Sequence, residues 1–270
     1  MGAEPRQSAV RDDTGRVFAF SATITQVPAS GRVPVRAWLS GGAVGGGNHS
    51  IAVEPAEADA QRTTVSLTQA SGSVLCRKGK APCATVSAGT ALAFFVETSD
   101  EFNNRRDSSS ALPVQYSFGG ASLAFANDNG VGTYGIALPA SALETSAEYS
   151  LVVRLGGIEL KSSPVTIAVA PGLAAPSQIF IAREGVQCTS LEPCGGALVA
   201  GKRLRLSTMA KDAYGNRLVS SGGVVEVRVG DGTIALEDAD DGTYAAKIPL
   251  TLAGEHAVVA TLGGVEVANR

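Results

Sequence analysis

The stretch Glu-Tyr-Ser-Leu-Val-Val-Arg-Leu-Gly-Gly at residues 148–157 recurs without gaps as Glu-His-Ala-Val-Val-Ala-Thr-Leu-Gly-Gly at residues 255–264. Before the Gly-Gly pair, every second residue is apolar in the first copy, and so are three of the four in the second, where His256 is the exception. This is the period of a β-strand with one buried face. The Gly-Gly pair supplies the positive φ angles of a tight hairpin turn. The recurrence therefore predicts a strand and hairpin that occur twice in the chain.

Further blocks recur around this strand in the same order. Residues 99–104 match residues 211–216, and residues 129–134 match residues 239–244. The separation drifts from 112 to 107 residues along the chain, as changes of loop length between duplicated domains would produce. Runs typical of strands lie between Gly, Asn, Asp and Pro clusters in both copies, so we expect antiparallel β-sandwiches.

The repeat divides the chain into three predicted segments. Residues 63–171 form one repeat, and residues 172–270 form a second that lacks its last strand, since no counterpart of residues 163–169 follows. Residues 11–54 resemble the C-terminal half of a repeat, so residues 1–62 are expected to hold a partial repeat and a linker. Because both ends fall inside repeats, we expect the chain to be an excerpt of a longer protein.

Composition limits the classes of partner. The 270 residues are 44% hydrophobic, which can fill real cores and excludes a wholly disordered chain. A net charge of −3 argues against nucleic acid or acidic lipid as the main partner. The longest apolar runs are far shorter than the ~20 residues that span a bilayer, so no transmembrane segment is expected. Protein partners or neighbouring repeats therefore remain as the expected binding partners.

The four cysteines fall as two close pairs, Cys76 with Cys83 and Cys188 with Cys194. An even number in local pairs favours two short disulfide loops and hence an oxidising compartment. Reduced thiols and a zinc site are the alternatives, although zinc prefers closer spacings within each pair. Asn48 begins an Asn-His-Ser glycosylation sequon, which would carry an N-glycan only in a secreted protein.

The sequence offers no candidate catalytic, cofactor-binding or metal-binding residues. Of the two histidines, His256 aligns with Tyr149 of the other repeat, which indicates a packing position. The acidic turn that starts at Asp238 fails the EF-hand pattern, because Pro249 stands where that pattern needs Glu. No Ser-His-Asp, Cys-His or paired-carboxylate arrangement is found, so no enzyme activity is expected.

The blocks Lys-Asp-Ala-Tyr-Gly-Asn at 211–216, Asp-Asp-Gly-Thr-Tyr at 240–244 and Gly-Gly at 263–264 resemble a filamin-type immunoglobulin-like repeat. The resemblance covers residues 65–270 and, more weakly, residues 11–54. It implies an all-β fold of tandem antiparallel Ig-like (filamin-type) β-sandwiches. The extra cysteine pairs depart from the ordinary cytoskeletal pattern, and similar repeats also occur in extracellular adhesion proteins.

The resemblance implies a non-enzymatic structural or adhesion segment of a cell-surface or extracellular protein that acts by protein–protein contact. Repeats of this type accept a partner strand along the edge formed by their third and fourth strands. A purely structural edge, kept from pairing by Glu226 and Arg228, is the alternative. By resemblance, this edge lies near residues 224–229 with 232–236 in the last repeat and near residues 113–118 with 122–126 in the middle repeat. Its candidate binding residues are Val225, Val227, Val229, Val114 and Tyr116.

Two other functions remain open at this point. The first is a cytosolic filamin-like scaffold or an actin-crosslinking cytoskeletal protein, which free thiols and an unglycosylated Asn48 would favour. The second is an accessory β-sandwich segment of a larger secreted enzyme.

Overall fold

The structure is a computed structural model of the chain. It describes residues 8–11, 18–21, 32–39, 42–69, 72–188 and 197–267, with side chains from residue 53 onward. Close contacts divide the chain into two compact units. The first holds Met1–Cys83, Ala93–Ala137 and Ser150–Thr166, and the second holds Ala84–Leu92, Leu138–Tyr149 and Ile167–Arg270. The predicted domain boundaries after residues 62 and 171 stay predictions.

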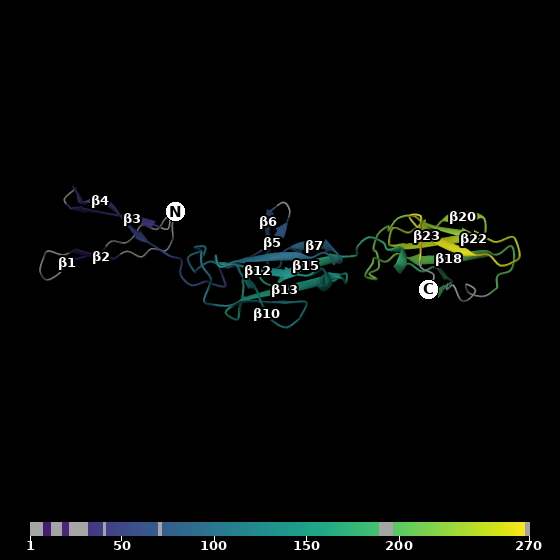
Figure 1. Ribbon diagram of the computed structural model, residues 1–270, viewed down its shortest axis with the longest axis horizontal. Helices are drawn as coiled ribbons and strands as arrows, with labels where there is room; N and C mark the ends of the chain where they lie inside the picture. The colour runs from purple at the N-terminus through teal and green to yellow at the C-terminus, as the bar shows by residue number, and fades with distance from the viewer. Residues whose placement is uncertain are drawn as a thin grey trace. The chain divides into compact units, whose positions relative to one another are not determined.

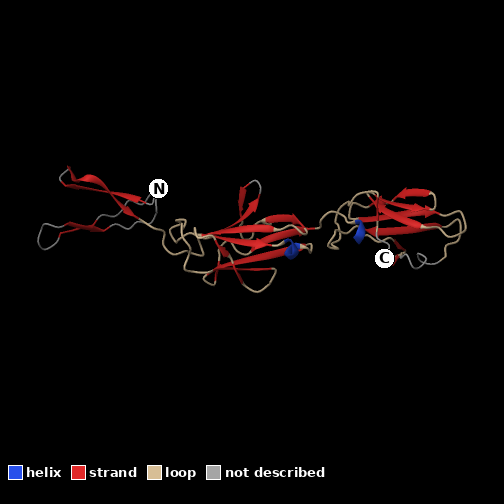
Figure 2. Ribbon diagram, viewed as in Figure 1, coloured by secondary structure: helices blue, strands red, loops and turns tan. Residues whose placement is uncertain are grey.

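Strands and loops make up nearly all of the described chain, as Figure 2 shows in red and tan. Two short 3-10 helices, η1 (Ala140–Leu143) and η2 (Pro176–Gln178), are added to them. The first strands are β1 (Ser8–Arg11), β2 (Phe18–Ser21), β3 (Arg32–Leu39) and β4 (Gly42–Ala52). The next are β5 (Thr64–Gln69), β6 (Gly72–Leu75), β7 (Ala84–Ser87), β8 (Leu92–Glu97), β9 (Val114–Phe118), β10 (Ala124–Phe125), β11 (Asn127–Asp128), β12 (Thr133–Leu138), β13 (Ala147–Leu155), β14 (Ile158–Glu159) and β15 (Val165–Ala170). The last are β16 (Ala182–Arg183), β17 (Val186–Gln187), β18 (Arg203–Met209), β19 (Val225–Val229), β20 (Gly232–Ala235), β21 (Glu237–Asp238), β22 (Thr243–Pro249), β23 (Val258–Leu262) and β24 (Val265–Glu266).

Strands β5 to β15 form two sheets, several of whose strands are labelled in Figure 1. One sheet has the order β11-β12-β8-β5-β6, and the other has the order β10-β9-β13-β15-β7, with β14 beside β13. Only Ala126 separates β10 from β11, so the chain changes sheets at this residue. Two sheets joined by strands that switch between them are typical of an Ig-like sandwich.

Strands β16 to β24 repeat this plan in the orders β17-β16-β18-β22-β21 and β20-β19-β23-β24. Along β18, Leu204, Leu206 and Thr208 are buried and the residues between them are exposed. This alternation confirms the period-two pattern, because it places one face of the sheet on the core. The core of this part includes Ile181, Leu206, Val225, Val227 and Tyr244.

The predicted fold class is confirmed: the described chain is all-β, and its sheets are largely antiparallel Ig-like layers. The pairing of β15 with β7 is parallel. Both Gly-Gly pairs lie in hairpin turns at positive φ, at 56° and 84° for residues 156–157 and at 56° and 83° for residues 263–264. Side chains of L-residues rarely adopt such angles, which is why glycine occupies these turns.

The N-terminal strands form two antiparallel hairpins. β1 pairs with β2, and β3 pairs with β4 with a register shift between Val35 and Ala37. Asn48 lies in β4, but its side chain lies outside the described part of the structure. Glycosylation of Asn48 therefore stays a prediction.

Candidate functional site

The Asp-x-x-x-Asn motif of the last repeat surrounds one buried carboxylate with donors. Asp212 is 1% exposed. Its Oδ1 accepts hydrogen bonds from the backbone N–H groups of Tyr214 and Asn216, both at 2.9 Å. Its Oδ2 accepts from Asn216 Nδ2 at 2.8 Å and from the backbone N–H of Gly172 at 2.8 Å. The carboxylate thereby ties the segment that enters the last repeat to the motif itself.

The middle repeat makes the same contacts 112 residues earlier. Asp100 Oδ1 accepts from the N–H groups of Phe102 at 3.0 Å and Asn104 at 2.8 Å. Its Oδ2 accepts from Asn104 Nδ2 at 2.9 Å and from the N–H of Ala56 at 3.0 Å. We call this arrangement the linker clasp: an Asp and the Asn four residues later, which hold the N–H of the preceding segment.

The electrostatics of the clasp keep its carboxylates ionised. Burial raises the pKa of Asp212, but the hydrogen bonds from the Asn216 side chain and from the N–H groups of Gly172, Asn216 and Tyr214 outweigh burial and hold the pKa below its usual value. Burial and the matching donors, with Asn104 first, leave the pKa of Asp100 lowered in the same way. These groups therefore act as fixed hydrogen-bond acceptors and do not exchange protons near neutral pH.

A left-handed residue closes the turn of each clasp. Asn103 has φ 68° and Gly215 has φ 84°. Glycine and asparagine tolerate this region best among the common residues. The resulting turn brings the N–H of Asn104 or Asn216 back to the carboxylate of the Asp four residues earlier.

The Gly-Thr-Tyr block of each repeat packs against a residue that follows its clasp in the chain. Gly132 and Gly242 have φ +69° and +80°, and a Cβ on either would overlap the backbone of Arg106 or Leu218. The hydroxyl of Tyr134 accepts a hydrogen bond from the N–H of Ser110 at 2.8 Å.

Tyr244 accepts in the same way from Gly222 at 2.7 Å. Burial raises the pKa of Tyr134, which keeps its hydroxyl neutral. The blocks that recur in the sequence are thus neighbours in space.

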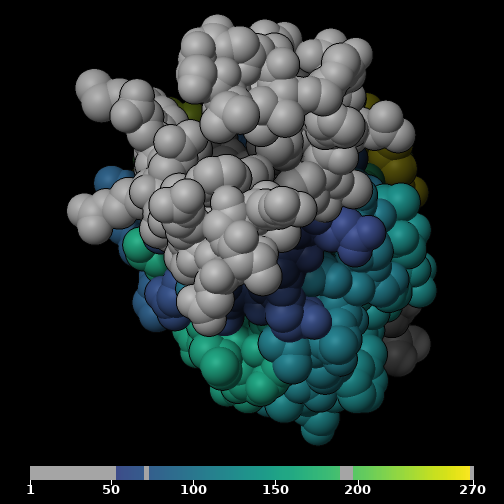
Figure 3. Space-filling view, turned by 90° about the vertical axis from the view of Figure 1, so that its left-hand side faces the viewer, coloured from purple at the N-terminus to yellow at the C-terminus, as the bar shows by residue number. Residues whose placement is uncertain are grey.

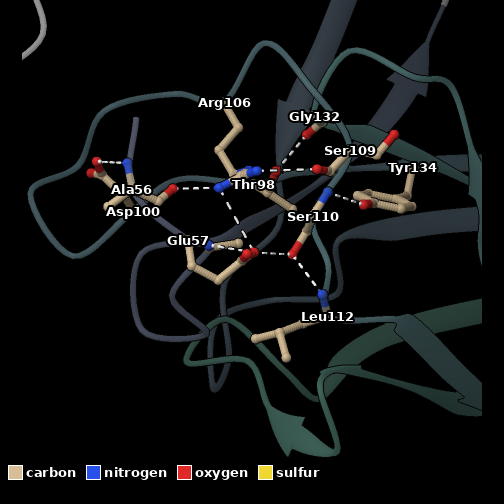
Figure 4. Close-up of polar contacts among 11 residues, drawn as sticks. Ala56, Glu57, Thr98, Asp100, Arg106, Ser109, Ser110, Leu112, Gly132 and Tyr134 are labelled. Atoms are coloured by element: carbon tan, nitrogen blue, oxygen red, sulfur yellow. Dashed lines mark hydrogen bonds and ion pairs between the residues drawn. The ribbon is translucent and has the colours of Figure 1, made fainter. Parts of the chain in front are cut away.

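The middle repeat adds an ionic group to its clasp, shown in Figure 4. The Arg106 side chain is 11% exposed. Its Nη1 donates to the carbonyl of Ala56 and lies 3.7 Å from Glu57 Oε1, while Nη2 donates to Ser109 O at 3.1 Å. Ser110 Oγ donates to the same Glu57 oxygen at 2.6 Å.

The Ser110 hydroxyl and the N–H of Ala58 lower the pKa of Glu57, with a smaller contribution from Arg106. The guanidinium thereby binds both backbone and side chain of the linker. Figure 3 shows the blue surface of the residues that follow position 53 directly against the teal surface of residues beyond 100.

Sequence reasoning missed Arg106. The counterpart of Arg106 in the last repeat is Leu218, which is buried and 5% exposed. An arginine at the position of a core leucine was the available signal, because a buried guanidinium requires acceptors.

Within the second unit, the clasp of the last repeat also reaches residues 89 and 144–146. Asn216 Nδ2 donates to Glu144 O at 2.6 Å, and Asn216 Oδ1 accepts from the N–H of Ser146 at 2.9 Å. The Tyr214 ring lies so close to Gly89 that a Cβ there would overlap it. These partners belong to the segment predicted as the middle repeat, so one Asn contacts both its own repeat and the segment before it.

The structure joins Cys76 and Cys83 in a disulfide, with Cα atoms 5.2 Å apart. Cys188 is also disulfide-bonded. The predicted partner of Cys188 is Cys194, which lies outside the described residues, so this second pairing stays a prediction.

The predicted binding edge includes two strands in each repeat, and its five named residues lie on the inner strand of each pair. β19, with Val225, Val227 and Val229, pairs with β20 on one side and β23 on the other. β9, with Val114 and Tyr116, lies likewise between β10 and β13. Their main-chain groups are therefore used on both sides, and the outer strands at this end of the described sheets are β20 and β10. These outer strands lie within residues 232–236 and 122–126 of the predicted edge, and partner binding there stays a prediction.

Within the described ranges, no group of three or more His, Cys, Asp or Glu side chains could hold a metal ion. In the same part of the chain, no helix is long and apolar enough to cross a membrane.

No family model matches the sequence, and no curated protein matches it. Among solved structures, the chain is similar to FdeC, an Escherichia coli adhesin, with a TM-score of 0.50 and 16% identity over 88% of this chain and 72% of that one. It is also similar to invasin, a bacterial integrin-binding protein, with a TM-score of 0.48 and 16% identity over 94% of this chain and 46% of that one. The chain thus spans less than half of the invasin structure. The likeness to FdeC supports the Ig-like fold.

Proposed function

We propose that this chain is a non-enzymatic segment of tandem filamin-type repeats in an extracellular or cell-surface adhesion protein. It acts by protein–protein contact and by spacing its neighbouring domains. The observation that carries this proposal is the linker clasp, which occurs twice with the same donors and acceptors. The motifs that the repeats share hold backbone segments together, which is a structural task.

The chemistry of the clasp also favours a structural role. A catalytic acid or base needs a pKa near the working pH and access to a substrate. The carboxyls of Asp100 and Asp212 are 1% exposed, and their pKa values are lowered. Their acceptor positions are occupied by donors of the protein itself.

Two further observations favour a location outside the cytosol. The Cys76–Cys83 disulfide is typical of proteins in oxidising compartments. FdeC, which shares the fold, is described as an adhesin. The repeat pattern of the Asp-x-x-x-Asn and Gly-Thr-Tyr blocks supports the filamin-type assignment within the Ig-like class.

Surface labelling of intact cells of the native host, together with a thiol count, tests this proposal. An antibody against the chain should label cells that have not been permeabilised, and the denatured, unreduced protein should contain no free thiol. Labelling only after permeabilisation, with four free thiols, would favour the cytosolic scaffold instead. A bead coated with the chain should bind cells or matrix more strongly than a bead coated with the reduced, alkylated chain.

A further inference from the structure

The outer face of the sheet that contains β8 and β12 holds a hollow of about 370 Å³. Its floor is built from small residues, which are Ala93 on β8 and Gly135 and Ala137 on β12. These positions alternate with buried core residues, so they face outward. A Cβ added at Gly135 would meet the Asn127 main chain no closer than 3.9 Å, so the space above the floor is open.

Three aromatic side chains form the walls of this hollow. Phe95 of β8 is 39% exposed and Phe125 of β10 is 71% exposed, while Tyr116 of β9 is partly buried. β8 belongs to one sheet, whereas β9 and β10 belong to the other, so the rings meet near the residue at which the chain changes sheets. Clustered exposed apolar groups of this kind mark interaction sites in many proteins.

The last repeat shows that the fold does not require these rings. The pairings of β9 with β10 and of β11 with β12 recur as those of β19 with β20 and of β21 with β22, which aligns the two repeats residue by residue. The hydrogen bond from the N–H of Thr98 recurs as the bond from the N–H of Ala210, which aligns β8 with β18. In this alignment, the positions of the three rings are taken by Ser207, Val227 and Ala235.

The same face of the last repeat is also charged. Exposed Arg205 and Lys247 stand at the positions of the two floor alanines, and exposed Glu237 stands at the position of Asn127. The same pairing of strands therefore forms with either surface. The aromatic, uncharged surface is a property of the middle repeat, as expected of a binding surface and not of a requirement of the fold.

The lining of the hollow determines which ligand fits. Among the described residues that line it, none carries a charge, so a charged ligand would lose water without gaining a partner. The polar side chains are Tyr116 and Asn127, whose hydroxyl and amide groups can donate hydrogen bonds. The ligand must therefore be uncharged, present apolar groups to the rings and offer acceptors to these donors. A volume of about 370 Å³ is near the lower end for ligand pockets, so only a few residues of a peptide fit.

We propose that this hollow binds a proline-rich segment of a partner protein in the polyproline II conformation. Aromatic-lined grooves bind such segments, whose conformation is already formed before binding, so little entropy is lost. A polyproline II segment has no internal hydrogen bonds, so its carbonyl groups are free to accept from Tyr116 and Asn127. A helix, by contrast, uses its carbonyl groups internally. The proposal concerns the middle repeat alone and does not depend on the proposed location outside the cytosol.

Titration of the isotope-labelled full chain with a blocked peptide of about ten prolines, which is about three turns of polyproline II, tests the proposal by NMR. The backbone amide signals of Phe95, Asn127 and Gly135 should shift and saturate. Those of β18 and β22 should not move, because the corresponding face of the last repeat is charged. A Gly/Ser peptide of the same length, which is flexible and has no rings, should not bind.

Two variants copy the last repeat within the hollow. Phe125→Ala removes the most exposed of the three rings and should weaken peptide binding at least about tenfold, as truncation of an aromatic anchor does. Ala137→Lys places a charge on the floor and should weaken binding to a similar extent. The control Ile158→Ala removes an apolar side chain that is 61% exposed outside the hollow, and it should leave the affinity unchanged. Because all three positions are exposed, hydrogen exchange in β8 and β12 should show that each variant stays folded.

Absence of saturable shifts would overturn the proposal, and so would equal binding of the Gly/Ser peptide or equal affinities of Phe125→Ala and Ile158→Ala. Saturable binding of an uncharged oligosaccharide such as maltohexaose, with no binding of the proline peptide, would identify a sugar as the ligand and would also contradict the proposal. None of these outcomes changes the labelling of intact cells, so failure of the peptide to bind is distinguishable from failure of the proposed function.

Discussion

Replacement of Asp212 by Asn perturbs the linker clasp with a side chain of almost the same size. Asp212 is 1% exposed, and each of its oxygens accepts two hydrogen bonds of 2.8–2.9 Å. An Asn side chain offers one acceptor oxygen and one NH2 group. In either orientation of the amide, the NH2 group faces two N–H donors, so two of the four hydrogen bonds are lost.

The expected loss follows from those two bonds. A hydrogen bond to a charged group contributes about 1.5–3 kcal/mol, and such contributions are not fully additive. When the NH2 group takes the position of Oδ2, one affected donor, Asn216 Nδ2, keeps its bond to Glu144 O and is therefore not left without an acceptor. We expect Asp212→Asn to lower the free energy of unfolding of the last repeat by about 3 kcal/mol.

Native-state hydrogen exchange at the amides of β18 and β22 measures this change in the full chain. The only tryptophan, Trp38, lies in β3, so its fluorescence does not report on the last repeat. Asp231→Asn makes the same change of charge at an exposed position and should cost less than about 0.5 kcal/mol. Equal effects of the two variants would refute the reasoning that the carboxylate holds the linker.

The pH dependence provides a second readout of the same substitution. The folded pKa of Asp212 is below its usual value of 3.8. A group with a lowered folded pKa contributes stability that is present above the unfolded pKa and is lost as the pH falls through the folded pKa. The stability difference between wild type and Asp212→Asn should therefore be full above pH ~5 and shrink below the unfolded pKa of about 3.8.

Three other changes test neighbouring features. Gly242→Ala should destabilise the last repeat by at least about 2–3 kcal/mol, because the Cβ would overlap the backbone of Leu218 at a positive φ. The control Gly264→Ala, whose Cβ would meet no atom within 4 Å, should cost only about 1 kcal/mol. Urea titrations measure both changes. Reduction of the Cys76–Cys83 disulfide should lower the stability of the middle repeat by about 2.5 kcal/mol on the loop-entropy model. Calorimetry with and without reductant measures this loss of stability. No change would show that the loop is already ordered without the bond. Arg106→Leu, which copies the last repeat, should speed proteolysis of the linker several-fold while leaving the exchange of β5 and β8 amides nearly unchanged, and an unchanged cleavage rate would contradict the role of the guanidinium.

The strands and their turns could be predicted from sequence because they depend on local pattern. The alternation of β18 and the Gly-Gly turns follow from residue type and from allowed φ angles, which neighbouring residues largely determine. The repeat alignment also predicted which blocks correspond, and the clasps of Asp100 and Asp212 confirm that correspondence atom by atom.

The tertiary partners could not be predicted in the same way. An Asp in a turn accepts nearby N–H groups in many proteins, but the capture of Gly172 joins residues 40 positions apart. The resemblance placed the binding edge on β19 together with the following run, β20, and only the sheet order shows which of the two strands is outermost. β20 is exposed at every residue, so its sequence has no buried alternation that would indicate its position in the sheet.

The Asp carboxylate of each clasp binds the incoming segment through a main-chain N–H, that of Ala56 or Gly172. Any amino acid except proline offers this donor. Natural selection can therefore alter the side chain at the entry of a repeat without loosening its attachment. A gene segment that encodes one repeat can be duplicated, deleted or moved beside a foreign neighbour, provided that a non-proline residue arrives at this position. The clasp thus offers the same attachment to whichever segment precedes a repeat, which suits a protein that evolves by gain and loss of repeats.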